Sequence, residues 1–312
     1  MFMLDKLINN IIHNIKKEPQ INQDINCVNK YINILISELY FNDKIQYLIN
    51  NKGKHIRTLL SLYYFHKYTT NNNHNIDALY QIMALVELTH FASLLHDDVI
   101  DNSNSRRHEK SLNYLYGNKN SILIGDYLLV NNFKKLLNVL QDKNYGNYIL
   151  NQFIKASSDT AYGAYLENNT KQQLNNDIQQ YIRIVSLKTG SLFKFSCICG
   201  CVLSNTNFVN IKQSAMFGLV FGIIYQVQND LNDYKYSNYQ ESEDYMQSNI
   251  TLPIIVLNYI ADISNLFNNK TQENFNKIKQ LINTEEFKSI LNNILEKYCI
   301  AAHKESIHNM PS

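Results

Sequence analysis

Carboxylates and arginines gather in one short segment of this chain. Asp97, Asp98 and Asp101 stand at positions i, i+1 and i+4, and Arg106 and Arg107 follow just over one helical turn later. A hard divalent cation such as Mg²⁺ takes carboxylate oxygens on one side and phosphate oxygens on the other. Arginine grips phosphate oxygens at two points with a planar fork of donors, which lysine cannot do. The segment therefore predicts a diphosphate held through Mg²⁺.

The sparing use of arginine supports this prediction. The chain fills its basic positions almost entirely with lysine and has four arginines. Two of them follow the aspartates, and a third, Arg57, ends the run Gly53-Lys54-His55-Ile56-Arg57. Arginine is thus kept where its geometry would serve phosphate binding.

Composition narrows the class of protein. The 312 residues are 45% hydrophobic and 18% charged, which supplies a substantial core, and the net charge of +2 with no long basic stripe excludes a general nucleic-acid binder. Five cysteines, an odd number, do not form a disulfide framework and indicate a reducing, cytoplasmic compartment. Cys197, Cys199 and Cys201 fit a buried helical face better than the alternative, a metal site.

Two apolar segments are candidates for a targeting helix and for a membrane span, and neither fits. Residues 1–17 are amphipathic and fit an ordinary first helix better than a targeting helix, because Asp5 is present and arginine is absent. The longest apolar stretch, 80–95, is interrupted by Glu87 and His90 and falls short of a bilayer span.

Helical periodicity runs through nearly the whole chain. Nine glycines and three prolines leave few turns, and no run of clean alternation persists. The predicted helices cover 22–40, 54–68, 76–101, 120–141, 145–168, 175–204, 208–235, 250–267, 272–283 and 285–301. No linker divides them, so we predict one all-α domain over 1–312, with 1–20 as an N-terminal extension or first helix.

Two of these helices differ from the rest. Segments 80–96 and 214–227 are apolar nearly all round, which predicts the centre of a bundle. Each ends in an acidic cluster, the first at 97–101 and the second at 229–233. Carboxylates at a helix C-terminus oppose the helix dipole, so a bound cation would justify both clusters.

In its motifs and their order the chain resembles the trans-prenyl diphosphate synthases of the long-chain, octaprenyl type. The resemblance runs from about residue 25 to past Pro253. It is carried by Gly53-Lys54-x-x-Arg57, His90, the aspartates at 97–101, Arg106-Arg107, Gly125-Asp126, Lys188-Thr189, Tyr225-Gln226, the cluster at 229–233 and Thr251-Leu252-Pro253.

This resemblance implies an isoprenoid-synthase-like fold, a single large bundle or barrel of long helices around a deep central cavity, with the two acidic motifs facing each other across its mouth. It implies a Mg²⁺-dependent prenyltransferase that condenses isopentenyl diphosphate with an allylic diphosphate such as farnesyl diphosphate. The product would be a long all-trans polyprenyl diphosphate, as used for quinone side chains. A homodimer, or a heteromer, and peripheral membrane contact for product release would follow.

The resemblance also assigns roles to residues. Asp97, Asp98, Asp101 and Lys188 would be catalytic. Asn229, Asp230 and Asp233 would join Asp97 and Asp101 as metal ligands. The allylic diphosphate would contact Arg106, Lys188, Thr189 and Gln226, and isopentenyl diphosphate would contact Lys54, Arg57, His90 and Arg107.

Product length follows from helix geometry. A residue five positions before Asp97 lies about 7 Å deeper along the helix. That residue is Ala92, with Ser93 beside it. Small side chains there leave a shaft open, and Phe91 points about 100° away. We therefore expect a long product.

Several positions depart from the family pattern. Lys52, His55 and Thr58 replace a glycine, an arginine and a proline. Ala164 and Glu167 stand where glutamate and glutamine are usual, Asn229 replaces the first aspartate of the second motif, and Asn249 replaces a lysine. An amide oxygen can bind Mg²⁺ but brings no charge. Either drift in base composition has altered tolerant positions, or the chain is a non-catalytic or regulatory subunit of a heteromeric synthase.

Two further alternatives fit less well. A metal phosphohydrolase built on His96 and Asp97 would need more histidine ligands nearby. A head-to-head condensing enzyme or a terpene cyclase would not need the basic residues Lys54 and Arg57.

Overall fold

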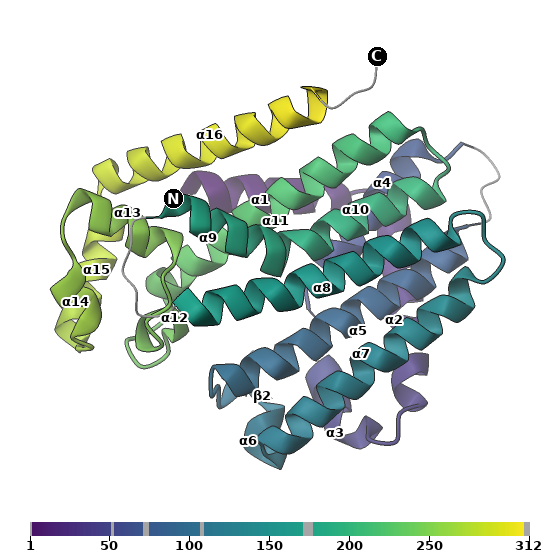
Figure 1. Cartoon of the computed structure of the whole chain (residues 1–312), viewed down its shortest axis with the longest axis horizontal. Helices are drawn as coiled ribbons and strands as arrows, with labels where there is room; N and C mark the ends of the chain where they lie inside the picture. The colour runs from purple at the N-terminus through teal and green to yellow at the C-terminus, as the bar shows by residue number, and fades with distance from the viewer. Residues whose placement is uncertain (1, 51–52, 71–74, 107–108, 171–176, 309–312) are drawn as a thin grey trace. The chain divides into compact units, whose positions relative to one another are not determined.

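The structure is a computed structural model, and it describes residues 2–50, 53–70, 75–106, 109–170 and 177–308. The described chain is almost entirely helical, which confirms the all-α prediction (Figure 1). Its contacts divide into two compact units. Unit 1 comprises Met1–Ile11, Ser158–Lys194 and Ala215–Ser312, and unit 2 comprises Ile12–Ser157 and Phe195–Ser214. The prediction of a single domain stays a prediction.

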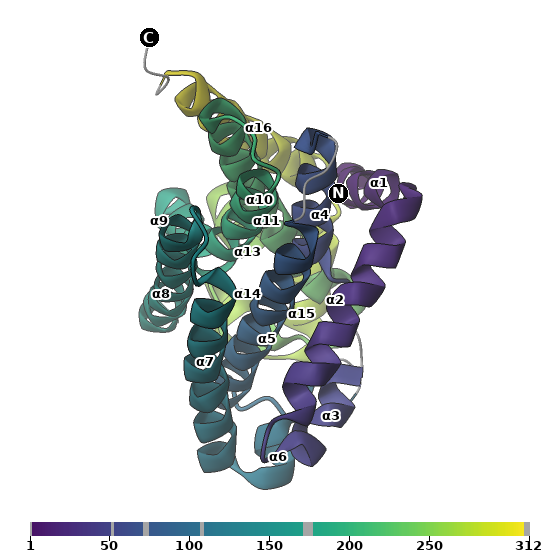
Figure 2. The ribbon, with the colours of Figure 1, turned by 90° about the vertical axis from the view of Figure 1, so that its right-hand side faces the viewer.

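Unit 2 holds the first acidic motif. Its elements include α2 (Pro19–Ser37), α3 (Asn42–Asn50), α4 (Ile56–Tyr68), α5 (Ile76–Ile100), β1 (Ser105–Arg106), β2 (Glu109–Lys110), α6 (Leu112–Tyr116) and α7 (Asn118–Leu140). The two short strands pair antiparallel, with Arg106 opposite Glu109. Helices α5 and α7 run side by side (Figure 2).

Side-chain hydrogen bonds fix α7 against α5 at two levels. Ser121 donates to the backbone oxygen of Leu95 at 3.0 Å, and Asn132 donates to the hydroxyl of Thr89 at 3.0 Å. All these groups except the backbone are buried polar side chains, which cost free energy unless paired. These hydrogen bonds fix how far α5 is shifted along α7, and hence the position of the aspartates at the end of α5.

A buried carboxylate joins three helices at the other end of this unit. Asp24 on α2 is 1% exposed and accepts hydrogen bonds from His66 on α4 and Tyr80 on α5, each at 2.5 Å. Burial alone would raise the pKa of Asp24, but these bonds and the one from Gln20 lower it below its usual value. The carboxylate therefore holds α4 and α5, the helices that carry the candidate site of unit 2.

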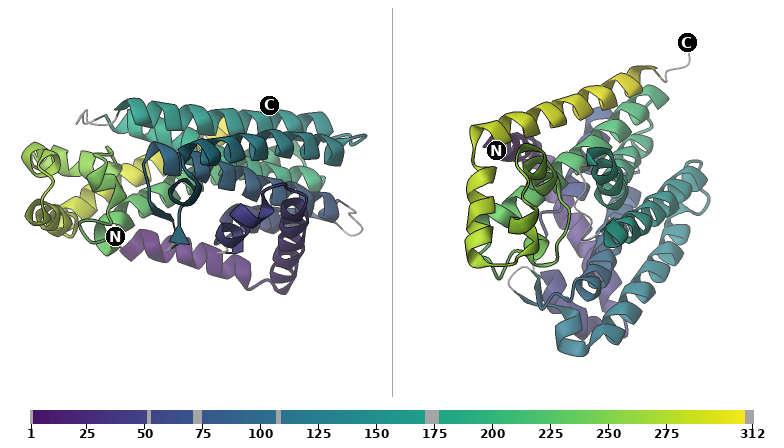
Figure 3. Two further views of the ribbon diagram at one scale, coloured as in Figure 1. Left: turned by 90° about the horizontal axis from the view of Figure 1, so that it is seen from below. Right: turned by 60° about the vertical axis from the view of Figure 1, so that its left-hand side comes forward.

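Unit 1 holds the second acidic motif. It contains α9 (Ile178–Val185), the π-helical turn η1 (Ser186–Gly190), α12 (Glu243–Met246), α13 (Leu252–Ile260), α14 (Ser264–Asn268), α15 (Gln272–Ile282) and α16 (Glu285–His308). In Figure 3 the yellow α16 lies beside the yellow-green helices α13 and α15. One apolar core, with Tyr234, Phe267 and Phe275 fully buried in it, runs through this unit.

Four helices contribute residues to both units: α1 (Phe2–Lys16), α8 (Gly146–Thr170), α10 (Ser191–Leu203) and α11 (Phe208–Tyr236). The helix α1 is the first helix that the sequence predicts. The three buried cysteines of α10 are free thiols, as expected, and burial raises their pKa values.

One expectation about apolar helices was wrong. Segments 76–100, 178–203 and 208–236, among the described residues, are long and apolar enough by length and composition to cross a membrane, so the length argument against a span fails. Within segment 214–227 of α11, Ser214, Ala215, Phe221, Ile223 and Val227 are buried, and Phe217 is exposed.

Candidate active site

The first acidic motif occupies the C-terminal end of α5. Asp97 and Asp101 are half-buried, whereas Asp98 is 1% exposed. The backbone N–H of Asp101 donates to Asp97 O at 2.8 Å, and that of Ser103 donates to Asp98 O at 2.9 Å. The helix therefore ends within the motif, and its aspartates project from a fixed terminal turn.

Asp98 and Arg106 form an ion pair. Asp98 Oδ1 accepts hydrogen bonds from both Nε and Nη2 of Arg106 at 2.6 Å. Burial raises the pKa of Asp98, and the hydrogen bond and charge of Arg106 only partly offset that rise. Asp98 thus fixes the position of the Arg106 guanidinium, a role that supports substrate binding and is not that of a metal ligand.

Close packing fixes His96 beside this motif. A Cβ at Gly125 of α7 would lie 2.4 Å from His96 Nε2, so the glycine lets the ring lie directly against α7. The same Nε2 lies 3.2 Å from Asp126 Oδ1. The Gly125-Asp126 pair therefore seats the ring that precedes Asp97.

The predicted basic motif begins α4 in the same unit. Lys54 is exposed, and Arg57 and His90 are half-buried. His55 takes a left-handed backbone conformation with φ 48°, and its Nδ1 lies 3.4 Å from Glu87 Oε2. Besides the acidic motif, unit 2 thus contains Lys54 and Arg57 at the start of α4 and Arg106 on β1.

Glu87 is a site residue that the sequence analysis did not assign. Thr58, in place of a proline, donates to Glu87 Oε1 at 2.7 Å. Burial would raise the pKa of Glu87, but the bonds from His55 and Thr58 and the charge of Arg57 lower it to about 2. A lone carboxylate in an apolar helix was the available signal, since it requires buried partners.

In unit 1, Lys188 and Thr189 lie on the π-helical turn η1. A Cβ at Gly163 of α8 would lie 2.4 Å from the backbone N of Lys188. A Cβ at Gly222 of α11 would lie 2.7 Å from the Cα of Gly190. Backbones on both sides therefore approach the turn closely and fix the lysine by main-chain contact. Single π-helical turns often occur at functional sites.

A chain of hydrogen bonds joins this turn to the second acidic motif. Thr189 Oγ1 donates to Gln226 Oε1 at 2.9 Å, and Gln226 Nε2 donates to Asp230 Oδ1 at 2.8 Å. Tyr181 donates to Asp230 Oδ2 at 2.5 Å. Burial raises the pKa of Asp230 to about 7 in spite of these two donors. No motif or spacing in the sequence predicted a role for Tyr181.

The other members of the second motif differ in exposure. Asn229 is exposed, whereas Asp233 Oδ2 accepts from Ser242 Oγ at 2.5 Å and from the N–H of Asp244 at 3.2 Å. Burial, followed by the charges of neighbouring aspartates, raises the pKa of Asp244 well above its usual value. Asn249 donates to Asp244 Oδ1 at 3.1 Å. Asp233 therefore also holds the loop that follows α11.

The acidic groups fit a metal only together with a ligand. Within the described ranges, no group of three or more His, Cys, Asp or Glu side chains could hold a metal ion unaided. Mg²⁺ in nucleotide and diphosphate sites commonly takes one or two carboxylates, and phosphate oxygens and water complete its shell. Oxygen donors of the types present in both motifs suit such a shared shell.

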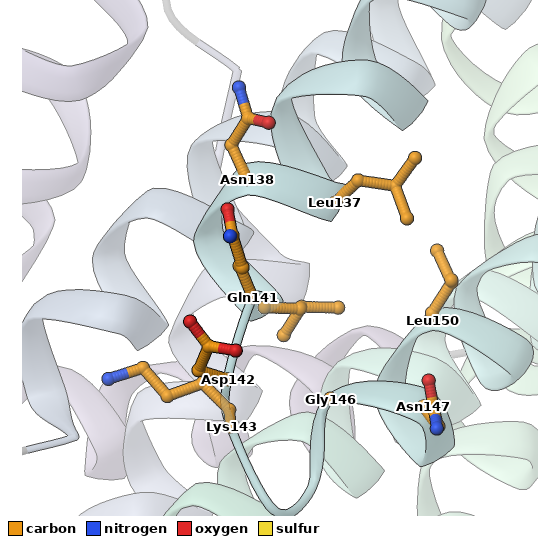
Figure 4. Close-up of a pocket in the computed structure, with 9 residues that line it drawn as sticks. Leu137, Asn138, Gln141, Asp142, Lys143, Gly146, Asn147 and Leu150 are labelled. Carbon is orange, nitrogen blue, oxygen red and sulfur yellow. The ribbon is translucent and has the colours of Figure 1, made fainter.

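An open pocket of about 500 Å³ lies elsewhere in unit 2, at the turn between α7 and α8 (Figure 4). Leu137, Gln141, Asp142 and Leu150 are among its lining residues. Tyr145, in the same turn, hydrogen bonds to Asn75 at the start of α5. Asn75 precedes α5, whose other end carries the acidic motif, so this turn lies toward the end of α5 that is away from the motif.

The predicted residues thus fall into two groups. Unit 2 brings together Asp97, Asp98, Asp101 and Arg106, and unit 1 brings together Lys188, Thr189, Gln226, Asp230 and Asp233. Arg107 lies outside the described residues. That the two motifs face each other remains a prediction.

Comparisons with known proteins give the similarities of the whole chain. The family model described as "Polyprenyl synthetase" matches residues 38–292. The hexaprenyl pyrophosphate synthase of Saccharolobus solfataricus is 37% identical over 157 residues, which are 50% of this chain and 51% of that protein. The decaprenyl-diphosphate synthase of Dictyostelium discoideum is 36% identical over 159 residues, or 49% of this chain and 32% of that protein.

The matched segments therefore span about a third to a half of the length of these curated relatives. Among solved structures, the polyprenyl synthase of Caulobacter crescentus, complexed with calcium and isoprenyl diphosphate, has a TM-score of 0.80 at 22% identity. That similarity covers 96% of this chain and 92% of the other, and it confirms the fold.

Proposed function

The chain belongs to the polyprenyl synthetase family, and on that premise we propose that it is a prenyltransferase that makes a long-chain all-trans polyprenyl diphosphate. Its substrates are isopentenyl diphosphate and an allylic diphosphate such as farnesyl diphosphate. The observation that carries the proposal is the bonded series from Thr189 through Gln226 to Asp230, beside Lys188. These hydrogen bonds connect the proposed diphosphate-binding residues Lys188, Thr189 and Gln226 to the second acidic motif.

The reaction requires that pyrophosphate leave an allylic carbon. Mg²⁺, when bound, neutralises the charge that develops on the leaving oxygens. Lys188, Thr189 and Gln226 hold this diphosphate, and the family resemblance assigns Arg106 to it as well; Asp98 orients the guanidinium of Arg106. Asp97 and Asp101 supply carboxylate oxygens to the metal. Fixed groups of this kind stabilise developing charge without reorganising.

Lys54, Arg57, His90 and Arg107 hold isopentenyl diphosphate with its double bond toward the allylic carbon. The C–O bond breaks to give an allylic cation and pyrophosphate, the isopentenyl double bond attacks this cation to form the new C–C bond, and the released pyrophosphate removes a proton to form the new double bond. Apolar helix walls exclude water, which would otherwise convert the cation to an alcohol. No protein nucleophile is needed.

Purified protein, farnesyl diphosphate, labelled isopentenyl diphosphate and Mg²⁺ test the proposal. We expect label in a long polyprenyl diphosphate, with chain length read by mass spectrometry. If label appears only after a second subunit is added, and Asp97→Ala in this chain leaves that activity unchanged, the chain is the non-catalytic subunit instead. If neither condition yields product and neither substrate binds, the proposal is wrong.

Assembly and location complete the proposal. A homodimer in the cytoplasm, with peripheral membrane contact when the apolar product leaves, follows from the family resemblance. Light scattering of the purified protein and fractionation of cells would test these two properties.

A further inference from the structure

Four departures from the family pattern lie in unit 1, at Ala164, Glu167, Asn229 and Asn249. Ala164 removes a carboxylate from α8 and Asn249 removes a lysine, whereas the other two have opposite effects on charge. Asn229 stands where an aspartate is usual, so a carboxylate is lost from the second acidic motif. Glu167 stands where a glutamine is usual, so a carboxylate is gained on α8. The net charge of the unit is unchanged by the pair of exchanges, but the position of one negative charge differs.

The new carboxylate contacts a residue of the proposed diphosphate grip. Glu167 Oε2 lies 2.5 Å from Lys188 Nζ. The side chains are 36% and 24% exposed, respectively, so a ligand can reach the pair. A carboxylate forms a charge-assisted bond to the ammonium, whereas the amide of a glutamine would form a weaker neutral one.

The remaining carboxylates of the second motif are poorly placed to replace the missing one. Asp230 is 3% exposed and accepts from Tyr181 and Gln226. Asp233 accepts from Ser242 and from the backbone of Asp244. Glu167 is more exposed than Asp230, and it already bonds to a cation that a diphosphate would contact.

Glu167 also acts electrostatically on the motif. Burial is the main cause of the raised pKa of Asp230, and the negative charge of Glu167 adds to it. The same order of causes holds for Asp244, where Asp230 and Asp233 act more strongly than Glu167. The carboxylate of Glu167 is therefore within electrostatic reach of the second motif.

We propose that Glu167 is a positioning residue for Lys188 and supplies, from α8, the negative charge that Asn229 lacks. The inference rests on the proposed function. Without metal, the Glu167 carboxylate pairs with the Lys188 ammonium and repels an incoming diphosphate. With Mg²⁺, the carboxylate attracts the cation, and Lys188 turns to the diphosphate. Glu167 thus makes diphosphate binding depend on the metal.

The measurable quantity is a coupling factor, the affinity for an unreactive diphosphate with Mg²⁺ divided by that without it. Farnesyl thiodiphosphate, in which sulfur replaces the bridging oxygen, serves as the probe, and calorimetry in Mg²⁺ or in EDTA gives both affinities. We expect Glu167→Gln to tighten metal-free binding about threefold and to lower the coupling factor about fivefold.

A second exchange tests the compensation. Asn229→Asp alone should raise the coupling factor, and Glu167→Gln combined with Asn229→Asp should return it to within about twofold of the wild type. Glu273→Gln is the matched control, because it removes a carboxylate from an exposed ion pair with Lys277 in the same unit. This control should leave the coupling factor unchanged.

The outcomes separate the two proposals. A purely structural role for Glu167 would weaken both affinities alike and preserve their ratio, which would overturn the inference while the proposed function stands. Metal-dependent binding by the wild type with the same coupling factor in Glu167→Gln would do so too. A wild type that binds the probe under neither condition would overturn both proposals.

Discussion

Both Nε and Nη2 of Arg106 lie 2.6 Å from the same carboxylate oxygen of Asp98. The aspartate is buried and the arginine is about a quarter exposed. One middle residue of the acidic motif therefore fixes a cation, while its neighbours Asp97 and Asp101 remain half-buried at the helix end. The motif combines two tasks, cation positioning and metal binding.

Replacing the buried carboxylate should impair substrate binding through Arg106. We expect Asp98→Ala to raise KM for the allylic diphosphate about tenfold and to lower the free energy of unfolding by about 1–3 kcal/mol, because a partly buried guanidinium loses its partner. Asp98→Asn, which can still accept one hydrogen bond, should do less. Steady-state kinetics and urea unfolding measure both effects. Equal KM values in wild type and Asp98→Ala would exclude this positioning role.

The half-buried aspartates should matter for catalysis and little for folding. Asp97→Ala or Asp101→Ala should lower kcat/KM at least about a hundredfold, since each removes a proposed metal ligand. Neither should destabilise the helix, because a negative charge at its C-terminus opposes the dipole. Circular dichroism and initial rates at saturating Mg²⁺ provide the check, with the exposed Asp43→Ala as control. Near-normal turnover in both variants would refute the metal assignment.

Product length should depend on the residue below the first motif. Ala92 is 0% exposed, so a larger side chain must enter the interior of unit 2. We expect Ala92→Phe to shorten the product and Ala92→Val to shorten it less, at a cost in stability of about 1–3 kcal/mol for the larger residue. Mass spectrometry of products and melting curves separate the two effects. A folded, active Ala92→Phe with unchanged products would place the limit on length elsewhere.

Acid should weaken unit 2 through Glu87. Its pKa falls from 4.5 to about 2 on folding, so the unfolded chain binds the proton more readily. The stabilisation is fully present above about pH 4.5 and is lost as the pH falls toward about 2. It amounts to roughly 3 kcal/mol, since each pKa unit corresponds to about 1.4 kcal/mol.

Glu87→Gln should therefore be less stable than the wild type at pH 7, and its stability should fall less steeply between about pH 4.5 and 2. Unfolding by urea at several pH values measures this. Parallel stability curves for the two proteins over that range would contradict the assignment.

Periodicity alone predicted the long helices, because each buries an apolar stripe that can be recognised within one segment. The segment 76–101, for example, corresponds to α5, which ends at Ile100. The short helices α3, α6 and α12 were not predicted, because they have too few turns to show a hydrophobic period. The predicted helix 250–267 divides into α13 and α14 at Ala261–Ile263, where no glycine or proline marks the break.

The site was predictable to the extent that motif spacing placed residues on one helix end. Asp97, Asp98 and Asp101 needed only the chain itself. The contacts of Asp230 with Tyr181 and of Glu87 with Thr58 join residues 49 and 29 positions apart, and that of Asp233 with Ser242 closes the loop after α11. Such partners depend on how helices pack, and one sequence holds no local signal for that. The same is true of η1, which lies inside the predicted helix 175–204.

The turn η1 has a practical consequence for engineering. Gly163 of α8 and Gly222 of α11 both lie close to the backbone of η1. Main-chain contacts, rather than neighbouring side chains, therefore fix the position of Lys188. A library that diversifies the side chains around the lysine would explore chemistry without moving it. Any library that includes these two glycines would instead change where the ammonium sits, and most of its members would be lost before selectivity could be scored.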